Sequence, residues 1–316
     1  MFADVIMHVN VYLIYRVNMT SGKRQHLVPQ QMIRRFSGTD GKLVEFHKES
    51  LRIGSRRRSP KGILYFDDYY RDICSDFDND LLNAVEQKFA QYYPKIADQK
   101  KPEKLSGDGG AALIDWISAM LCRTQSLATL SQAIVQKELS SSVMIPENSL
   151  KLFHNIIRSE CYNEYQDILS RPHFKWRMKI FPEGCDIVIT DNPVCQTNGL
   201  QDGGQATLVP LSKRLILIGG QDKAVEKFRN VTIDEINLFL FAWAYKSIYA
   251  AEKHTLESIK KTLDGIDNKE WCEAARKPLF GMPGRIKEKS IPSDINVSQW
   301  YNDMKDKYGE SILPGD

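Results

Sequence analysis

The sequence has no long apolar run and none of the short motifs that assign a chain to a common nucleotide-binding or serine-hydrolase class. Its most apolar stretch, residues 1–15, is interrupted by Asp4, His8 and Asn10, so it falls short of the roughly 18–20 apolar residues of a membrane-spanning helix. The stretch also lacks the basic start and the small-residue cleavage site of a secretory signal. The glycines form neither a P-loop nor a dinucleotide fingerprint, and no serine lies in a G-x-S-x-G elbow. We therefore expect no membrane partner and none of these sites.

The six cysteines include no C-x-x-C pair and no zinc-ligand spacing. Several have apolar neighbours, as Cys122 does after Ala119, Met120 and Leu121. A disulfide framework is unusual in a chain of 316 residues, whereas reduced cysteines are normal in the cytosol. The cysteine pattern therefore favours a cytoplasmic protein.

Charge is nearly balanced over the whole chain but not along it. The 43 lysines and arginines exceed the 40 aspartates and glutamates by only three. Residues 21–62 contain eleven basic and three acidic residues, whereas residues 67–86 contain seven acidic residues and one basic residue. The small net charge therefore hides a basic block followed by an acidic block.

Hydrophobic periodicity predicts helices and strands that do not alternate regularly. Strand-like segments lie at residues 43–46, 62–66, 185–190, 206–209 and 214–218. Helical segments lie near Pro29, around residues 81–89, and at 111–139, 149–169 and 232–251, the last opened by a Thr232-x-x-Glu235 capping box. This order favours an α+β fold, a predominantly helical single domain with a small mixed or antiparallel sheet.

We expect one core domain over residues 19–250. Residues 1–18 are expected to be an N-terminal extension, with Met19 as a simple alternative start of translation. Residues 251–316 are polar and contain several prolines, so we expect a helical and irregular C-terminal extension there.

Residues 24–36, with the sequence RQHLVPQQMIRRF, resemble the opening motif of DUF4238, a microbial family of unassigned function. That motif has the form His-x-Val-Pro-x-x-x-Leu-Arg-x-Phe, and Ile33 stands here for its usual Leu. Later pieces of the family pattern follow in the same order: Glu86, Arg123-Thr124, Thr190 to Val194 (with Thr190 for the usual Ser), Pro210-Leu211-Ser212, and a closing helix from Ile236 through Ala244 to Tyr249. The resemblance covers about residues 23–250 and implies no activity.

His26 is the first candidate for a functional residue. It precedes the helix expected at Pro29, where it would act as a general base or a metal ligand and where an anion would also bind well. Gln30 and Arg34 lie on the expected helix and are candidate substrate or phosphate ligands, because an Arg fork suits a phosphate. The structural alternatives are a histidine that bonds a backbone carbonyl, and an Arg34 that forms a buried ion pair with Glu86 or Asp191.

Glu86 and Arg123 both lie at the apolar boundary of their expected helices. A carboxylate there needs a partner, a metal or a proton, and Arg123 has apolar helical neighbours. Glu86 is therefore a candidate catalytic residue or metal ligand, and Arg123 a candidate phosphate ligand. The alternative is that the two form an ion pair of purely structural importance.

Asp191 and Asn192 follow an apolar strand, at a position where side chains commonly enter a site. Asp191 would hold Mg²⁺ or Mn²⁺ together with Glu86 and His26, and Asn192 would contact the substrate. Against this, Asp-Asn-Pro is a strong turn sequence. A structural turn therefore stays open as the alternative.

The basic block suggests a partner. Arg52, Arg56, Arg57, Arg58 and Lys61 precede a cluster of tyrosines and phenylalanine, a pattern typical of contact with nucleic acid. The alternative is that the basic block is neutralised within the chain.

Two functions from different classes follow. The first is a metal-dependent, nuclease-like hydrolase that acts on a phosphodiester, in a setting such as microbial defence. Its catalytic residues would be His26, Glu86 and Asp191. The second is a non-catalytic sensor or binding module in which the same residues form a buried polar network. The first requires an open pocket lined by these groups, and the second allows them to be paired and dry.

Overall fold

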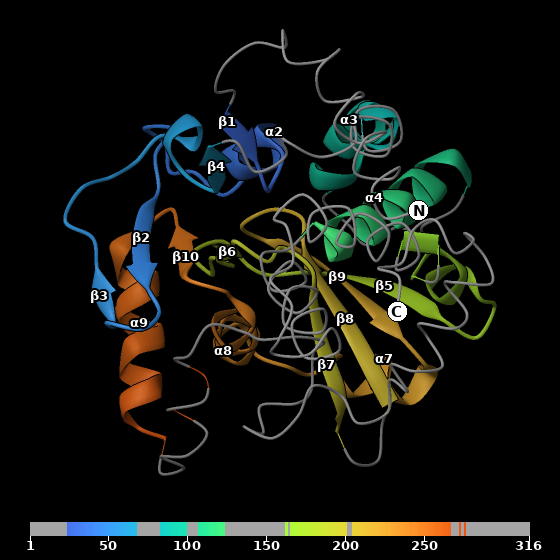
Figure 1. Ribbon diagram of the computed structural model, residues 1–316. Coiled ribbons are helices and arrows are strands. Elements are labelled where there is room, and N and C mark those ends of the chain that lie inside the picture. Colours follow the sequence, from blue (N-terminus) through green and yellow to red (C-terminus); the bar gives the residue numbers. More distant parts are fainter. Residues whose placement is uncertain are drawn as a thin grey trace, which may run out of the picture.

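The computed structural model of the 316-residue chain describes residues 24–67, 83–99, 107–123, 162–163, 165–200, 204–266, 272 and 275 (Figure 1). The expected extension at residues 1–18, most of the expected helix at 149–169 and the second half of the helix expected at 111–139 lie outside these residues. No helix among the described residues is both long and apolar enough to cross a bilayer.

The N-terminal part places a short strand and a short helix next to each other. Strand β1 (Arg24–His26) pairs antiparallel with β4 (Tyr65–Asp67), which follows the 3₁₀ helix η1 (Pro60–Gly62). Helix α2 (Gln30–Arg34) begins directly after Pro29 and buries Met32 and Ile33. Proline is well tolerated there because its missing N–H would have no partner within the helix.

One four-stranded antiparallel sheet joins distant parts of the chain. Its order is β3 (Arg52–Ile53), β2 (Val44–His47), β10 (Ser247–Ala250) and β6 (Ile189–Thr190). Strand β10 is buried along its whole length, because strands pair with it on both sides.

A second antiparallel sheet has the order β5 (Lys175–Ile180), β9 (Leu215–Gly220), β8 (Gly204–Pro210) and β7 (Cys195–Leu200). All six residues of β9 are buried, and helix α7 (Asp222–Lys227) contacts this sheet. Gly219 faces Trp176 across the β5–β9 pair, and a side chain at Gly219 would collide with the rings of Phe174 and Trp176. The glycine therefore makes room for two aromatic rings.

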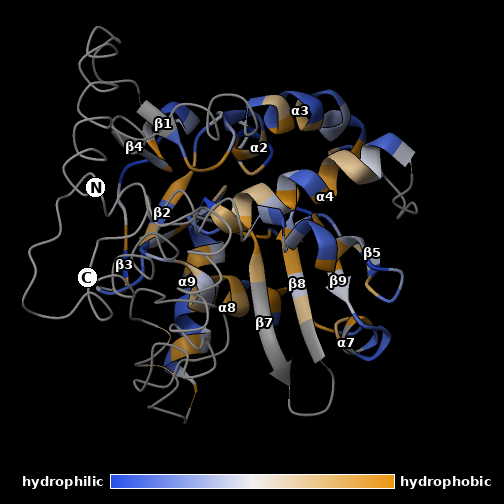
Figure 2. Ribbon diagram, turned by 45° about the vertical axis from the view of Figure 1, so that its right-hand side comes forward, coloured by the Kyte–Doolittle hydropathy of each residue, from blue (hydrophilic) through white to orange (hydrophobic). Residues whose placement is uncertain are grey.

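Helices α3 (Asn83–Ala97) and α4 (Gly107–Cys122) pack against each other through aromatic rings. The rings of Phe89 and Trp116 stack with centroids 4.3 Å apart. The Tyr93 hydroxyl donates a hydrogen bond of 2.5 Å to the Leu211 carbonyl, which connects α3 to the end of β8. Figure 2 shows α4 as largely apolar and α3 as mixed, which agrees with the deeper burial of α4.

Helix α8 (Ile233–Trp243) begins as the sequence predicts and ends earlier. Both hydrogen bonds of the Thr232–Glu235 capping box are present. The prediction that the helix continues to residue 251 is wrong, because residues 247–250 form β10 between β2 and β6. Helix α9 (Lys253–Asp264) then contacts α8, β10 and β3.

The predicted α+β class is confirmed. In the described chain the strands that pair with each other are antiparallel, and no helix connects two parallel strands of one sheet. The arrangement matters for function because α2 and α3, distant in sequence, lie beside each other at one end of the molecule (Figure 1).

Candidate functional site

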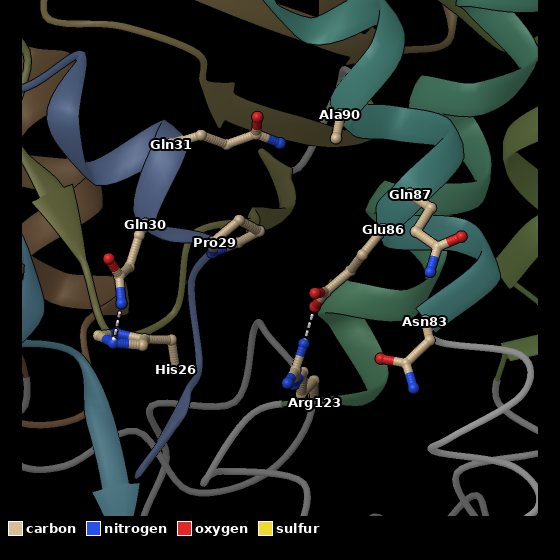
Figure 3. A pocket seen from close by; sticks show the side chains of 9 residues that line it. All are labelled: His26, Pro29, Gln30, Gln31, Asn83, Glu86, Gln87, Ala90 and Arg123. Atoms are coloured by element: carbon tan, nitrogen blue, oxygen red, sulfur yellow. Dashed lines mark hydrogen bonds and ion pairs between the residues drawn. The ribbon is translucent and has the colours of Figure 1, made fainter. Parts of the chain in front are cut away.

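A cavity of about 410 Å³ lies between α2 and α3 (Figure 3). We call it the pocket. Its walls come from the end of β1, the start of α2, the first half of α3 and the residue that follows α4. The residues that line it are His26, Pro29, Gln30, Gln31, Asn83, Glu86, Gln87, Ala90 and Arg123.

His26 reaches the pocket because its neighbours are anchored in the core. It is the last residue of β1 and lies opposite Tyr65 of β4, whose ring it meets edge-on at 6.0 Å between centroids. The next two residues, Leu27 and Val28, are buried, and the Leu27 amide donates to the Leu64 carbonyl over 2.8 Å. The backbone therefore fixes the imidazole at the pocket wall.

Gln30, the first residue of α2, lies four residues after His26 and contacts its ring. Its Nε2 atom lies 2.8 Å from Nε2 of His26. A side-chain amide has both donor and acceptor atoms, so Gln30 serves a neutral Nε2 by donating and a protonated Nε2 by rotating to accept. This partner orients the imidazole without fixing its protonation state, in contrast to a carboxylate.

Glu86 and Arg123 form an ion pair on the opposite wall (Figure 3). Glu86 belongs to the first turn of α3, and Arg123 follows the last residue of α4. The Arg123 side chain is only 12% exposed, whereas the Glu86 side chain is 31% exposed. The guanidinium therefore lies deeper, and the carboxylate borders the open space.

Amides make up much of the remaining lining. Gln31 comes from α2, whereas Asn83 and Gln87 come from α3. Together with Gln30 they place several donors and acceptors around one carboxylate, one guanidinium and one imidazole. The pocket is therefore suited to a polar ligand with many hydrogen-bonding groups.

Asp191 does not line the pocket. Its carboxylate accepts hydrogen bonds from the backbone N–H groups of Tyr245, Lys246 and Ser247, over 2.7, 2.6 and 3.1 Å. Burial raises the pKa of this carboxyl, and the three N–H groups and the Lys48 ammonium act in the opposite direction. The structure places Asp191 at the connection between α8 and β10, where it holds the backbone.

Asn192 contacts the end of α8 beside the same connection. Its Nδ2 donates to the Trp243 carbonyl over 3.1 Å, and Asn192 is only 1% exposed. The Thr190 hydroxyl bonds both the N–H and the carbonyl of Asn192, which forms a tight turn. The observed hydrogen bonds at this strand end are therefore those of a structural turn.

Lys48 is a member of this cluster that the sequence analysis missed. Its residue is 1% exposed, and Nζ donates to the carbonyls of Ala242 and Ala244 over 2.7 and 2.5 Å. Burial lowers the pKa of Lys48 to about 7, although the charge of Asp191 raises it in part. Strand alternation was the available signal, because position 48 continues the buried positions 44 and 46.

The arginines predicted to bind phosphate or nucleic acid have different surroundings. Arg34 is exposed in the last turn of α2 and is not part of the pocket wall. Arg57 pairs with Asp40 at 2.8 Å and with Glu252 at 3.2 Å, and Arg58 pairs with Glu45 at 2.8 Å. The three remaining basic residues of the predicted surface are exposed: Arg52, Arg56 and Lys61.

The donor set of the pocket does not resemble that of a divalent-cation site. Mg²⁺ and Mn²⁺ favour several oxygen ligands, yet the lining offers one carboxylate, which is ion-paired, and one imidazole. No group of three or more His, Cys, Asp or Glu side chains is arranged to hold a metal anywhere in the described chain. The predicted cation therefore stays a prediction, and the described residues do not fit it.

Comparison with known proteins supports the resemblance seen in the sequence. The model of one family, described as "Protein of unknown function (DUF4238)", matches residues 24–254, which is well over half of the chain. No curated protein and no solved structure matches the chain.

Proposed function

Because this chain belongs to the DUF4238 family, whose description assigns no activity, we propose its function from the pocket: it is a nuclease-like hydrolase that cleaves phosphodiester bonds there. One observation carries the proposal. An imidazole, a carboxylate and a guanidinium, supplied by His26, Glu86 and Arg123 from three separate segments, line one open cavity.

These three groups have the chemistry that phosphodiester cleavage needs. His26 and Glu86 are the types of side chain that most often transfer protons in enzymes. The planar Arg123 guanidinium suits the charge that develops on phosphate oxygens in the transition state. Gln30 is a positioning residue, because its contact with Nε2 orients the imidazole.

The Glu86–Arg123 ion pair is compatible with catalysis by the same two groups. A phosphate that enters beside Arg123 would compete with Glu86 for the guanidinium. The carboxylate, which already borders the cavity, would then be available to accept a proton. The ion pair and the catalytic function are therefore successive states of the same groups.

The exposed basic residues extend the proposal to a polymer. Arg52, Arg56 and Lys61 are exposed, and η1, which contains Lys61, contacts α2 of the pocket. We assign them to phosphates of a nucleic-acid strand outside the cleaved bond. The free cysteines of the described chain agree with a cytoplasmic location, and the setting in microbial defence stays a prediction.

The second candidate function, a non-catalytic binding module, is favoured by one observation, the ion pair itself. Glu86 and Arg123 are paired as a purely structural network requires. Turnover distinguishes the two candidates, because a binding module would hold its ligand in the pocket without cleaving it.

The proposal is tested by incubating the full chain with labelled RNA and DNA, with Mg²⁺ or Mn²⁺ and separately with a chelator. We expect cleavage by the wild type and a loss of about 100-fold or more in His26→Ala, the range of a missing acid or base. His173→Ala, which changes an exposed histidine before β5, is the matched control and keeps the wild-type rate. Equal cleavage by His26→Ala and the wild type rejects this site, and binding without cleavage favours the second candidate.

A further inference from the structure

We infer that the substrate of the pocket is a ribonucleotide strand, which is cleaved by attack of its own 2′-hydroxyl with no metal ion taking part. The inference rests on the proposed function and names the substrate class of the same site. Two properties of the described lining support the inference: the nucleophilic side chains that it lacks and the proton-transferring groups that it contains.

We assign the imidazole and the carboxylate of the lining, His26 and Glu86, to proton transfer. Among the other described residues of the lining there is no Ser, Thr, Cys, Lys or Tyr that could attack phosphorus. With this assignment the nucleophile is a water molecule or a group of the substrate.

Activation of water at a phosphodiester usually depends on a metal-bound hydroxide. The described lining supplies one imidazole and one ion-paired carboxylate, which do not make up the oxygen-rich ligand set of Mg²⁺ or Mn²⁺. Asp191, the carboxylate expected to complete that set, instead accepts three backbone hydrogen bonds at the α8–β10 connection. The donor chemistry of the described lining thus favours a nucleophile carried by the substrate.

A ribose supplies that nucleophile. Its 2′-oxygen is tethered next to the 3′-phosphorus, so the substrate provides the proximity that a metal would otherwise provide. Such a reaction needs a base, an acid and a cation, which are the three kinds of group that Glu86, His26 and Arg123 bring to the pocket.

The step is balanced within the substrate and the two side chains. Glu86 takes the proton of the 2′-hydroxyl, the 2′-oxygen forms a bond to phosphorus, and the bond from phosphorus to the 5′-oxygen breaks. His26, on the opposite wall, gives a proton to the leaving 5′-oxygen (Figure 3). The products are a 2′,3′-cyclic phosphate and a free 5′-hydroxyl, and no water, oxidant or reductant is consumed.

The amides around these groups are suited to an unpaired base. Gln31, Asn83 and Gln87 offer donors and acceptors of the kind that read the edges of bases in single-stranded RNA. A DNA strand would meet the same amides but lacks the 2′-hydroxyl. Discrimination between RNA and DNA would therefore arise in the cleavage step and not in binding.

The test uses the full chain and a labelled DNA oligonucleotide that contains one ribonucleotide, with excess EDTA present. Matched oligonucleotides carry 2′-deoxy or 2′-O-methyl at the same position. We expect cleavage at the ribonucleotide alone, a 2′,3′-cyclic phosphate identified by mass spectrometry, and at least about 100-fold slower cleavage of the two analogues. Glu86→Gln and His26→Ala should slow the reaction by a similar factor, and His173→Ala should not.

The outcomes separate a failure of this inference from a failure of the proposed function. Comparable cleavage of the all-DNA strand overturns the substrate class, and activity that EDTA abolishes overturns the metal-free step. Either result leaves phosphodiester cleavage intact. No cleavage of any oligonucleotide, with or without Mg²⁺ and Mn²⁺, overturns the proposed function as well. The oligonucleotide series uses the wild-type protein, so these outcomes do not depend on the folding of a variant.

Discussion

Two clusters of polar side chains, both suggested by the sequence, have opposite surroundings in the structure. In the pocket, His26 and Glu86 have side-chain partners and border a cavity. In the α8–β10 junction, which we define as Lys48, Asp191, Asn192 and the backbone of residues 242–247, the polar groups bond main-chain atoms. The kind of partner therefore distinguishes a residue that holds the fold from one that is available to a ligand.

The junction replaces hydrogen bonds that the backbone loses where α8 ends. Lys48 and Asn192 bond carbonyls at the end of the helix, and Asp191 bonds the three N–H groups that lead into β10. Removal of one partner leaves buried backbone groups unpaired, which costs more than the bond itself contributes. The junction should therefore dominate stability, and the pocket should dominate activity.

The largest effect is expected for Asp191→Ala. The variant leaves three backbone N–H groups without their acceptor and removes the charge that favours the Lys48 ammonium, so the free energy of unfolding should fall by about 3–5 kcal/mol. Urea denaturation measures the loss. Asp264→Ala, at an exposed position near the end of α9, should change stability by less than about 0.5 kcal/mol. A loss below 1 kcal/mol in Asp191→Ala would contradict the structural role of the junction.

Glu86→Gln should show the reverse behaviour. The amide keeps the size of the side chain but does not accept the proton, so the cleavage rate should fall about 100-fold or more. Stability should change by less than about 1 kcal/mol, because the ion pair is partly exposed. Oligonucleotide cleavage and urea denaturation of the same preparation check both values. If stability fell as far as in Asp191→Ala, Glu86 would belong with the structural residues.

Lys48 makes the junction sensitive to pH. Its pKa is lowered from 10.5 to about 7 in the folded state, so between these values the unfolded chain binds more protons. The titration of Lys48 therefore raises the free energy of unfolding as pH rises through this window, by at most about 1.4 kcal/mol per pH unit. This gain disappears again as pH falls toward 7.

The matched comparison is Lys48→Met, which removes the titrating group. The free energy of unfolding of the wild type minus that of Lys48→Met should increase with pH from about 7 to 10.5. Lys246→Met, at an exposed position of the same connection, should leave the pH dependence of the wild type unchanged. Parallel curves for the wild type and Lys48→Met would mean that the buried amine is not perturbed.

The smallest effect is expected for the exposed arginines of the surface. Arg56 is exposed, whereas Arg57 is paired with Asp40 and Glu252. Arg56→Ala should reduce the salt dependence of binding to single-stranded RNA by about one phosphate contact, a slope change of about 0.7. Arg57→Ala should leave that slope unchanged and should lower stability by at most about 1 kcal/mol. Titrations at several salt concentrations measure both slopes, and equal slope changes would reject the distinction.

Much of the fold follows from local sequence, and its failures have a clear cause. The Thr232–Glu235 capping box predicts the start of α8 because its hydrogen bonds are local. The end of α8 was missed because β10 depends on pairing with residues 44–47 and 189–190, which are distant in sequence. Non-local pairing of this kind leaves no periodic signal in the segment itself.

The site shows the same limit. The position of Glu86 at an apolar boundary predicted that it needs a partner, and Arg123 was among the expected ones. Asp191 was grouped with Glu86 because a strand end resembles a site, but its partners lie at residues 245–247. The sequence identifies costly polar residues, whereas only the tertiary structure shows whether backbone groups or a cavity receive them.

One paired measurement tests the division between pocket and junction most directly. The cleavage rate per folded molecule and the free energy of unfolding are determined for Glu86→Gln and Asp191→Asn side by side. We expect Glu86→Gln to lose activity and keep its stability, and Asp191→Asn to lose stability and keep its activity. An Asp191→Asn variant that is stable but inactive, beside an active Glu86→Gln, would contradict this division.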